Sequence, residues 1–240
     1  MDRMQSTATG MDGLAEMYRA ITNNLANADT TGFKRRLIAF QEEGPAAAAA
    51  AYVPPSRITA AGQLDLSQGA LTQTGRRLDL ALDGEGFFVI ETAAGPRYTR
   101  NGAFRTDDSG QLVDAGGQLV GGEGGPIVVP SSVGAERVHV SRDGTVSATG
   151  QSIGRLRIVR CEDPTALVPE GTSRFRAPDD ADLQPAEGTV VHQGFRENAN
   201  VNLVEELVNL LTVTRLYEAN SKAARMQDRA QKSLLDVAMA

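Results

Sequence analysis

The side chains that could carry out acid–base or metal chemistry are few and widely separated in this sequence. The two histidines, His139 and His192, each lie in a run typical of a β-strand and are far apart along the chain. A catalytic or metal-binding histidine acts together with a carboxylate or with further ligands. No pattern of Asp or Glu accompanies either histidine, so a histidine-based site is the minor interpretation.

The single cysteine, Cys161, excludes an intramolecular disulfide bond and any zinc site with several thiolate ligands. It lies in the strand-like run LRIVRC, which favours a half-buried core cysteine over a nucleophile. Residues 121–125 (GGEGG) precede Pro126 and a strand pattern, whereas a phosphate cradle requires the start of a helix there. Residues 107–110 (DDSG) lack the other ligands of a calcium loop and predict a tight turn.

The overall charge and the absence of known catalytic motifs exclude several classes of function. The net charge of −6 argues against nucleic acid as the main partner, because phosphate binding needs a basic patch. The only basic run, Lys34-Arg35-Arg36, is expected to cover solvated surface. The sequence contains no motif of a serine hydrolase, a zinc protease or a P-loop protein. It therefore predicts a protein that is not an enzyme and that binds no cofactor and no metal.

Two clusters of asparagine stand out among the remaining polar residues: Asn23, Asn24 and Asn27 in the first cluster, and Asn198, Asn200 and Asn202 in the second. Helix capping and turn formation explain Asn27 and Asn202, because asparagine suits both roles. They do not explain Asn23 and Asn24, which lie inside a helical heptad pattern. Since buried amides can fix helix register, we interpret these two as specificity elements.

The elements that must position these residues are two terminal helices. Residues 198–240 contain neither Pro nor Gly and predict a helix of roughly 55 Å, which needs a long partner. The N-terminal segment offers one, because apolar residues recur there with heptad spacing over residues 4–28. We expect its firm part to run from Met11 to Asn27, with Gly32 as a left-handed terminator.

The C-terminal helix carries apolar residues on more than one face. Its second half has a narrow stripe that matches the N-terminal heptads: Leu216, Ala219, Ala223, Met226, Ala230, Leu234 and Val237. Its first half is broader: Leu203, Val204, Leu207, Val208, Leu210, Leu211 and Val213. A two-helix hairpin buries one stripe per helix. The apolar residues beyond that one stripe therefore predict contacts with further neighbours, including other subunits.

Between the helices the hydrophobic period changes from 3.6 to 2, which predicts a β-rich domain over residues 76–197. Residues 37–75 are expected to be a connector, because the run Ala46–Ala51 lies between prolines. Asp143-Gly144 predicts a short hairpin, residues 162–187 predict mostly loop, and residues 188–195 predict a final strand. The predicted fold class is α+β: terminal helices (residues 1–36 and 198–240) pair as a coiled coil, and a β-rich domain is inserted between them.

Five segments of the chain resemble those of bacterial flagellar rod and hook proteins. ITNNLANADTTGFKRR (21–36) resembles the N-terminal signature of this family, and NANVNLVEELVNLLTVTRLYEANSKAARMQD (198–228) resembles the C-terminal one. LALDGEGFFVIET, YTRNGAFRTDDSGQLV and VHVSRDGTVSAT resemble its β-domain segments, in the same order. VGGEGGPIVVP and IGRLRIV favour the proximal rod type, whereas YEANSK is closer to the distal rod type.

The resemblance implies a structural subunit of the flagellar basal-body rod that assembles through its terminal helices. The implied partners are other copies of the chain, neighbouring rod proteins and the flagellar type III export apparatus, without membrane insertion. The implied location is the periplasmic rod, reached without a cleaved signal peptide, and the opening MDRMQSTATG has no apolar signal region. The residues expected in the assembly interface are Met11, Leu14, Tyr18, Ile21, Asn23, Asn24, Leu25, Asn27, Gly32, Phe33, Asn200, Asn202, Leu203, Leu207, Leu210, Leu211, Tyr217 and Asn220.

Two functions from other classes stay open at this point. One is an enzyme carried on the β-rich domain, such as a cell-wall hydrolase, although the sequence shows no paired catalytic carboxylates. The other is an adaptor or export chaperone that binds a partner helix through its own amphipathic helices. In the free monomer, we expect the terminal helices to be largely disordered, because their apolar stripes lack a full set of partners.

Overall fold

The computed structural model describes residues 2–43, 57–131, 133–179 and 181–238, with side chains for residues 10–39, 62–131, 133–163, 165–179, 181–226 and 229. The chain forms two compact units. Unit 1 consists of Met1–Ala26, Arg36–Asp65 and Asn202–Ala240; unit 2 consists of Asn27–Arg35 and Leu66–Val201. Helices lie at both ends of the chain and strands fill the middle, so the predicted α+β class is confirmed.

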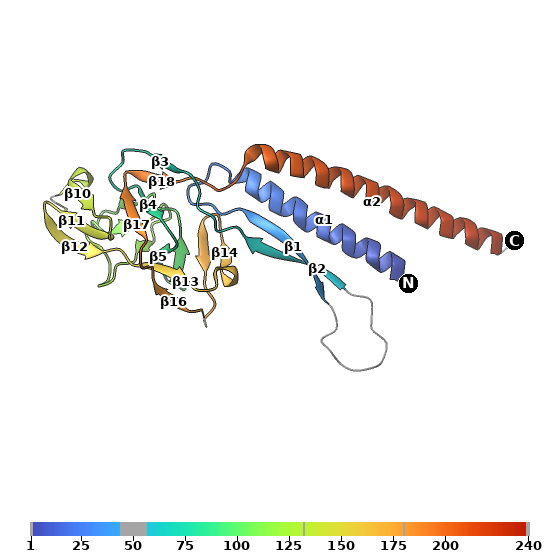
Figure 1. Ribbon diagram of the computed structural model, residues 1–240, viewed down its shortest axis with the longest axis horizontal. Coiled ribbons are helices and arrows are strands. Elements are labelled where there is room, and N and C mark those ends of the chain that lie inside the picture. The colour runs from blue at the N-terminus through green and yellow to red at the C-terminus, as the bar shows by residue number, and fades with distance from the viewer. Residues whose placement is uncertain (1, 44–56, 132, 180, 239–240) are drawn as a thin grey trace. The chain divides into compact units, whose positions relative to one another are not determined.

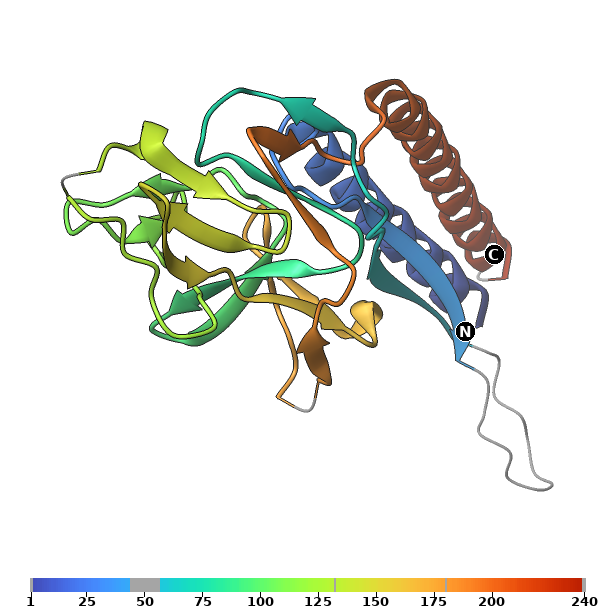
Figure 2. The same cartoon turned by 60° about the vertical axis from the view of Figure 1, so that its left-hand side comes forward.

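Unit 1 contains two long helices, α1 (Asp2–Ala26) and α2 (Leu203–Ala238), which lie side by side (Figures 1 and 2). α1 begins well before the predicted Met11 and continues through Gly10 and Gly13. It ends one residue before the predicted Asn27. Gly32 has a φ of 68°, but it lies in the turn that follows α1 and does not cap the helix itself.

A two-stranded hairpin completes unit 1. β1 (Arg36–Glu43) and β2 (Arg57–Leu64) pair antiparallel from Arg36↔Leu64 to Glu43↔Arg57, and both strands contact α1. The segment expected to be a connector therefore contains a hairpin that packs with the helices. The alanine run Ala46–Ala51 lies outside the described residues.

Unit 2 contains most of the strands. Its largest sheet has, in order along the sheet, β14 (Val168–Glu170), β15 (Arg174–Arg176), β6 (Gly95–Thr99), β5 (Phe87–Thr92), β9 (Leu119–Val120), β8 (Leu112–Val113) and β7 (Arg105–Thr106). β13 (Ile158–Cys161) pairs with β5 and with β16 (Leu183–Pro185). Every pairing in this sheet is antiparallel, as expected for strands joined by short turns.

Unit 2 also contains smaller sheets. They are the three-stranded β10 (Val138–Val140), β11 (Thr145–Ala148) and β12 (Gln151–Arg155), the pair β4 (Leu80–Asp83) and β17 (Val190–Gln193), and the pair β3 (Leu71–Gln73) and β18 (Phe195–Glu197). Two short 3-10 helices are η1 (Ala135–Arg137) and η2 (Pro164–Ala166). The predicted Asp143-Gly144 hairpin is confirmed, because it joins β10 to β11 with Val140 opposite Val146.

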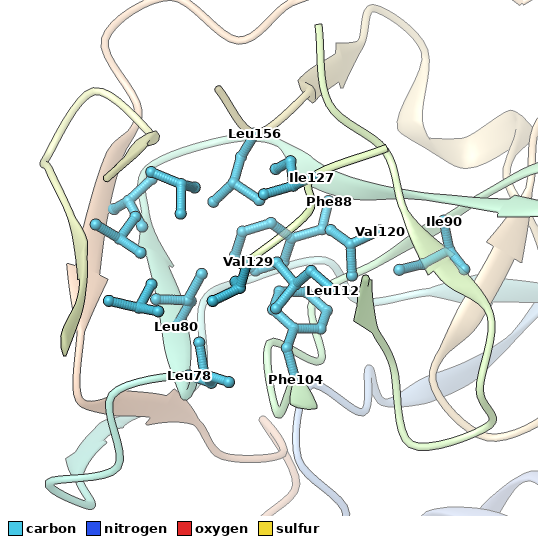
Figure 3. Packing of buried hydrophobic residues seen from close by; sticks show 14 of the residues in the cluster. Leu78, Leu80, Phe88, Ile90, Phe104, Leu112, Val120, Ile127, Val129 and Leu156 are labelled. Carbon is cyan, nitrogen blue, oxygen red and sulfur yellow. The ribbon is translucent and has the colours of Figure 1, made fainter. Parts of the chain in front are cut away.

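The core of unit 2 is built from buried residues of the strands and of the segments between them (Figure 3). Phe88 and Phe104 meet edge to face at its centre, with ring centroids 5.1 Å apart. Around them pack buried aliphatic side chains from several strands and loops, among them Leu80, Ile90, Leu112, Val120, Ile127 and Leu156. Strands β10 and β11 bury alternate residues, whereas β4 and β5 bury successive residues, so the predicted alternation accounts for only part of this core.

The end of the β-rich region differs from its prediction in one respect. Residues 162–187 are mostly loop, as predicted, with three short strands, β14, β15 and β16, within them. Phe175 anchors this stretch, because its buried ring packs edge to face against Phe87 at 5.6 Å. The single final strand is divided at Gly194, whose φ is 79°, into β17 and β18.

Candidate assembly interface

The first half of α2 exposes an apolar surface. Leu203, Val204, Leu207, Val208 and Leu211, here called the Leu/Val face, are spaced so that they lie on successive turns of the helix. All five are exposed, Val204 to 70% and Leu211 to 61%. Residues of these types are usually buried, and a contiguous exposed apolar patch marks an interaction site. The Leu/Val face is therefore the main candidate interface of unit 1.

The other side of α2 packs against α1. Leu14 and Ile21 of α1 form a buried cluster with Val213, and the partly buried Met17 and Leu210 pack against it. The structure thus brings together the predicted interface residues Leu14, Ile21 and Leu210. At ~100° per residue, the centre of the Leu/Val face lies roughly opposite Val213 around the helix. α2 therefore has one covered and one uncovered apolar surface.

The prediction that the second-half stripe of α2 matches α1 was wrong for its described side chains. Leu216, Ala219, Ala223 and Met226 are all exposed. The reason is helical geometry, since Leu216 is turned by ~60° and Ala223 by ~80° from Val213, which faces α1. Ala230, Leu234 and Val237 lie outside the side chains that the structure describes.

The two tyrosines of the predicted interface are also largely uncovered. Tyr18 of α1 is 47% exposed and Tyr217 of α2 is 44% exposed. Met11, Leu25 and Asn220 are half-buried. Exposed tyrosines suit an interface, because the ring provides apolar area and the hydroxyl keeps a hydrogen bond. These residues add to the surface that unit 1 offers to a partner.

Asn24 joins three elements of unit 1. Its buried side chain accepts a hydrogen bond from the backbone N–H of Arg36 at 2.8 Å and donates to the Arg36 carbonyl at 2.9 Å. Its Nδ2 also lies 3.4 Å from Oε1 of Glu206, a buried carboxyl on α2. The half-buried Asn23 belongs to the same turn of α1. Asn24 thus links α1, β1 and α2, which accounts for an amide inside the heptad pattern.

Asn202 caps α2, as its sequence position predicted. Its Oδ1 accepts hydrogen bonds from the backbone N–H groups of Val204 at 3.1 Å and Glu205 at 3.3 Å. These bonds satisfy donors that the first turn of a helix leaves unpaired. The cap fixes the start of α2 at Leu203, the first residue of the Leu/Val face.

The expectation that Lys34 is solvated was wrong. Lys34 is only 2% exposed in unit 2, and its Nζ donates to the carboxylate of Glu197 and to the carbonyl of Ser67, both at 2.6 Å. Glu197 is fully buried, and its second oxygen accepts from Nη1 of Arg100 at 3.3 Å. A buried charge is tolerated only when it is paired and hydrogen-bonded, which this cluster achieves for its carboxylate.

Arg100 completes this buried cluster. Its Nη2 donates to the carbonyl of Gly84 at 2.7 Å, and its guanidinium lies 5.4 Å from the centre of the Phe87 ring. Burial lowers the pKa of Arg100, while the neighbouring carboxylate of Glu197 acts in the opposite direction. One carboxylate therefore serves two buried cations, and Glu197 is the member that holds the cluster together.

The turn after α1 packs closely within unit 2. Gly32 donates its N–H to the Glu197 carbonyl at 2.8 Å, and a Cβ at this position would lie 2.3 Å from the backbone N of Asn101. Phe33, next to it, is buried to 1% exposure. Asn200 accepts from the backbone N–H of Arg35 at 2.7 Å and donates to Ser67. These predicted residues are brought together, but they serve the interior of unit 2.

Asn27 has a local role in the same turn. Its carbonyl accepts from the N–H of Thr30 at 2.9 Å, and its Oδ1 accepts from the Thr30 hydroxyl at 3.3 Å. This is the turn-forming function that the sequence predicted for it. The predicted interface residues therefore divide into those on the helices, those inside unit 2 and those in the turn.

Three family models match successive parts of the chain. Residues 9–34 match the flagella basal body rod protein family, residues 81–148 the D1 domain of the flagellar hook protein FlgE/F/G, and residues 192–237 the C-terminal region of the flagellar basal body rod FlgEFG proteins. A flagellar basal-body rod protein FlgF from Caulobacter vibrioides is 34% identical over 206 residues, covering 84% of this chain and 83% of the relative. The chain belongs to the flagellar basal-body rod protein family.

Relatives of both rod types match along most of the chain. FlgF from Escherichia coli is 33% identical, with 95% of each chain covered. FlgG from Bacillus subtilis is 31% identical, with 98% of each chain covered. The chain therefore has the structural role of a rod protein, and its location is the flagellar basal body. The resemblance seen in the five sequence segments is confirmed at the level of the family.

Sequence reasoning missed Lys34, Arg100 and Glu197 as a group. Lys34 lies within the matched N-terminal segment and Glu197 within the matched C-terminal segment of this flagellar family. Lys34 and Glu197 each lie in one of the two terminal family signatures. This common feature of the two residues could have suggested that they form a pair. Arg100 lies in YTRNG, which was recognised only as a β-domain segment.

The histidines, the cysteine and the 107–110 turn, which were considered first as possible chemical sites, lie on strands or in a turn of unit 2. His192 lies on β17 with its Nε2 3.3 Å from the Asp83 carboxylate, and His139 lies on β10. Cys161 lies on β13 as a core residue, as predicted, but it is buried and not half-buried, and burial raises the pKa of its thiol. Residues 107–110 form the predicted tight turn, with the Gly110 N–H donating to the Asp107 carbonyl at 3.0 Å.

Among the described residues, no group of three or more His, Cys, Asp and Glu side chains is placed to hold a metal ion. Within that same part of the chain, no helix combines the length and hydrophobicity needed to cross a membrane.

Proposed function

We propose that this protein is a subunit of the proximal part of the flagellar rod and that it assembles with other copies of itself and with neighbouring rod proteins through its terminal helices. The observation that carries the proposal is the Leu/Val face, five exposed Leu and Val side chains on a helix whose other side already packs against α1. Burying such a face contributes ~25 cal/mol for each Å² of apolar surface removed from water. Contact with further helices supplies that burial.

Sequence features support the proximal rod type over the distal type. The stretches VGGEGGPIVVP and IGRLRIV favour the proximal type, whereas YEANSK favours the distal one. The distal rod protein is the second candidate, because FlgG relatives cover the chain as fully as FlgF relatives. The type III export apparatus is a further partner in this proposal, and the periplasmic rod is the proposed position within the basal body.

The test of assembly replaces two central residues of the Leu/Val face. The double variant Leu207→Ser, Leu211→Ser should be produced normally but be missing from isolated basal bodies, and the cells should not swim. Thr212→Ser, an exposed polar position on the same helix, is the matched control and should leave swimming unchanged. Normal incorporation of the double variant would contradict assembly through this face. Soluble complexes with a single rod protein, without incorporation, would indicate an export chaperone.

Complementation distinguishes the two rod types. The gene should restore swimming to a strain of its own species that lacks the proximal rod protein, and it should fail in a strain that lacks the distal one. Rescue of only the second strain would assign the chain to the distal rod. Hydrolysis of purified peptidoglycan by the protein would favour the enzyme hypothesis instead.

A further inference from the structure

The chain enters and leaves unit 2 at neighbouring points. Unit 2 begins with residues 27–35, directly after α1, and ends at Val201, just before α2 starts at Leu203. Hydrogen bonds of 2.6–2.8 Å join these two segments: the Gly32 N–H and the Lys34 Nζ donate to Glu197, and the Arg35 N–H donates to Asn200. The five residues that make these bonds are here called the clamp.

The clamp packs closely on its neighbours within unit 2. A Cβ on Gly32 would lie 2.3 Å from the backbone N of Asn101. The carbonyl of Ser67 accepts hydrogen bonds from Lys34 at 2.6 Å and from Asn200 at 3.1 Å. The two segments are therefore joined to each other and to a third part of the unit, so unit 2 itself holds them together.

The two helices that adjoin the clamp gain little from each other. Leu14 and Ile21 of α1 form a buried cluster with Val213, and among the described side chains of α2 only Glu206 and Val213 are buried. Most helical stability in proteins comes from such packing. The end of α1 and the start of α2 are also roughly 175 residues apart along the chain, so bringing them together costs entropy.

We infer that the clamp keeps the two terminal helices close together in the free protein. It holds the segment after α1 beside the segment before α2, so the two helices meet at a high effective concentration. Shortening the free path between them from roughly 175 residues to about 12 raises that concentration about 50-fold, since the entropy of loop closure depends on the logarithm of loop length. The inference goes beyond the proposed function and holds for either rod type.

The clamp makes the pairing of the helices depend on the folding of unit 2. Lys34 and Glu197 are 163 residues apart in the chain, so they meet only when the β-rich region between them is folded. Before that point the two helical segments belong to distant parts of a flexible chain. A chain whose unit 2 is unfolded therefore does not present α1 and α2 as a pair.

A pair of cysteines in the core of unit 1 measures this effect. Ile21→Cys and Val213→Cys, in a Cys161→Ser background, place two thiols in the cluster where α1 packs on α2. The fraction of disulfide at equilibrium with reduced and oxidised glutathione gives the effective concentration of the two thiols in the monomer. The same pair is then measured in chains whose clamp is intact or opened.

The double change Gly32→Ala, Lys34→Met opens the clamp. The new Cβ collides with the Asn101 backbone, and the ion pair of Lys34 with Glu197 is lost. Arg100 keeps the Glu197 carboxylate paired. The free path between the helices then extends to β3, roughly 50 residues in all, so the effective concentration of the two thiols should fall about 10-fold.

Val146→Ala is the matched control, because it removes core volume from β11 and destabilises unit 2 without touching the clamp. It should leave the effective concentration unchanged. An unchanged value in the folded clamp variant would overturn the inference, and so would an equal fall in Val146→Ala, which would trace the effect to general stability. If the clamp variant does not fold, Asn200→Ala, which leaves Lys34 paired with Glu197, should give a smaller fall. Absence of that fall would likewise overturn the inference.

Discussion

The side-chain amide of Asn24 forms two hydrogen bonds with the backbone of Arg36, accepting from its N–H at 2.8 Å and donating to its carbonyl at 2.9 Å. This is the pair of bonds that a neighbouring strand residue would make. A residue on α1 therefore acts as the partner for the first residue of β1. Because Nδ2 also lies 3.4 Å from the buried Glu206 carboxyl, one side chain sets the register of both helices and the hairpin.

Replacing Asn24 should weaken unit 1 in a graded way. Asn24→Ala leaves buried partners unsatisfied, at a cost of about 1–3 kcal/mol. Asn24→Asp should cost more, because it removes the Nδ2 donor and places a second carboxyl beside Glu206. Swimming in soft agar and the amount of protein in isolated basal bodies should fall in the order wild type, Ala, Asp. Gln63→Ala, at an exposed amide on β2, is the control and should behave as wild type. Equal behaviour of Ala and Asp would argue against the Glu206 contact.

The buried cluster of unit 2 should respond unequally to loss of its members. Glu197→Gln removes the buried carboxylate that pairs with both Lys34 and Arg100 and should cost about 3–5 kcal/mol of the free energy of unfolding. Lys34→Met leaves the Arg100–Glu197 pair in place and should cost less. Urea unfolding followed by circular dichroism measures both, since the chain has no Trp. Glu187→Gln, at an exposed carboxylate, should leave the midpoint unchanged. A larger loss for Lys34→Met would show that Glu197 is not the central member.

A side chain at Gly32 would meet two obstacles, a left-handed backbone conformation and a close neighbouring backbone. Gly75 has the first feature without the second, so it serves as the comparison. Gly32 and Gly75 have similar φ values, 68° and 73°, but a Cβ on Gly75 meets nothing within 4 Å. Gly75→Ala should therefore cost only the ~1–2 kcal/mol of a left-handed residue. Gly32→Ala should cost about 1–3 kcal/mol more, because its Cβ collides with the Arg100–Asn101 backbone. Equal urea midpoints for the two variants would contradict the close packing of this turn.

Local patterns predicted the features that depend on neighbouring residues. The end of α1, the cap at Asn202, the turn at Asp143-Gly144 and the burial of Cys161 all follow from short stretches of sequence. Periodicity also showed that the C-terminal helix has more apolar surface than one partner can cover. It could not say which surface faces α1, because that choice depends on how the helices rotate against each other.

The missed features depend on residues far apart in the chain. The sequence around Lys34 predicts a basic run on the surface. Its burial depends on Glu197, which is 163 residues away in the chain and accepts a hydrogen bond from its Nζ. In the same way, Phe175 gives order to a polar stretch only because Phe87 lies next to it in space. Such pairs leave no periodic trace. They emerge from the fold or from the family signatures that contain them.

Cys161 should react slowly with thiol reagents while unit 2 is folded. Burial raises the pKa of its thiol, so the folded protein holds less of the reactive thiolate at any given pH. Because the thiol ionises at a lower pH in the unfolded chain, the protonated thiol of Cys161 stabilises the folded state. This contribution to the free energy of unfolding is fully present below the pKa of the unfolded thiol and is lost as the pH rises through the pKa of the folded thiol. Labelling rates with iodoacetamide between pH 7 and 10, in buffer and in urea, test this. Equal rates in the two conditions would show that the thiol is accessible in the folded state.

α2 should be the least protected element of the free monomer. Among its described side chains, only Glu206 and Val213 are buried, so the helix gains little from packing within one chain. Amides of residues 203–237 should exchange with deuterium within seconds in the monomer, whereas amides of the Phe88 core should exchange slowly. In assembled basal bodies the α2 amides should become protected, because neighbouring copies cover the Leu/Val face. Slow exchange throughout 203–237 in the monomer would mean that α1 alone stabilises α2, and that assembly does not order this helix.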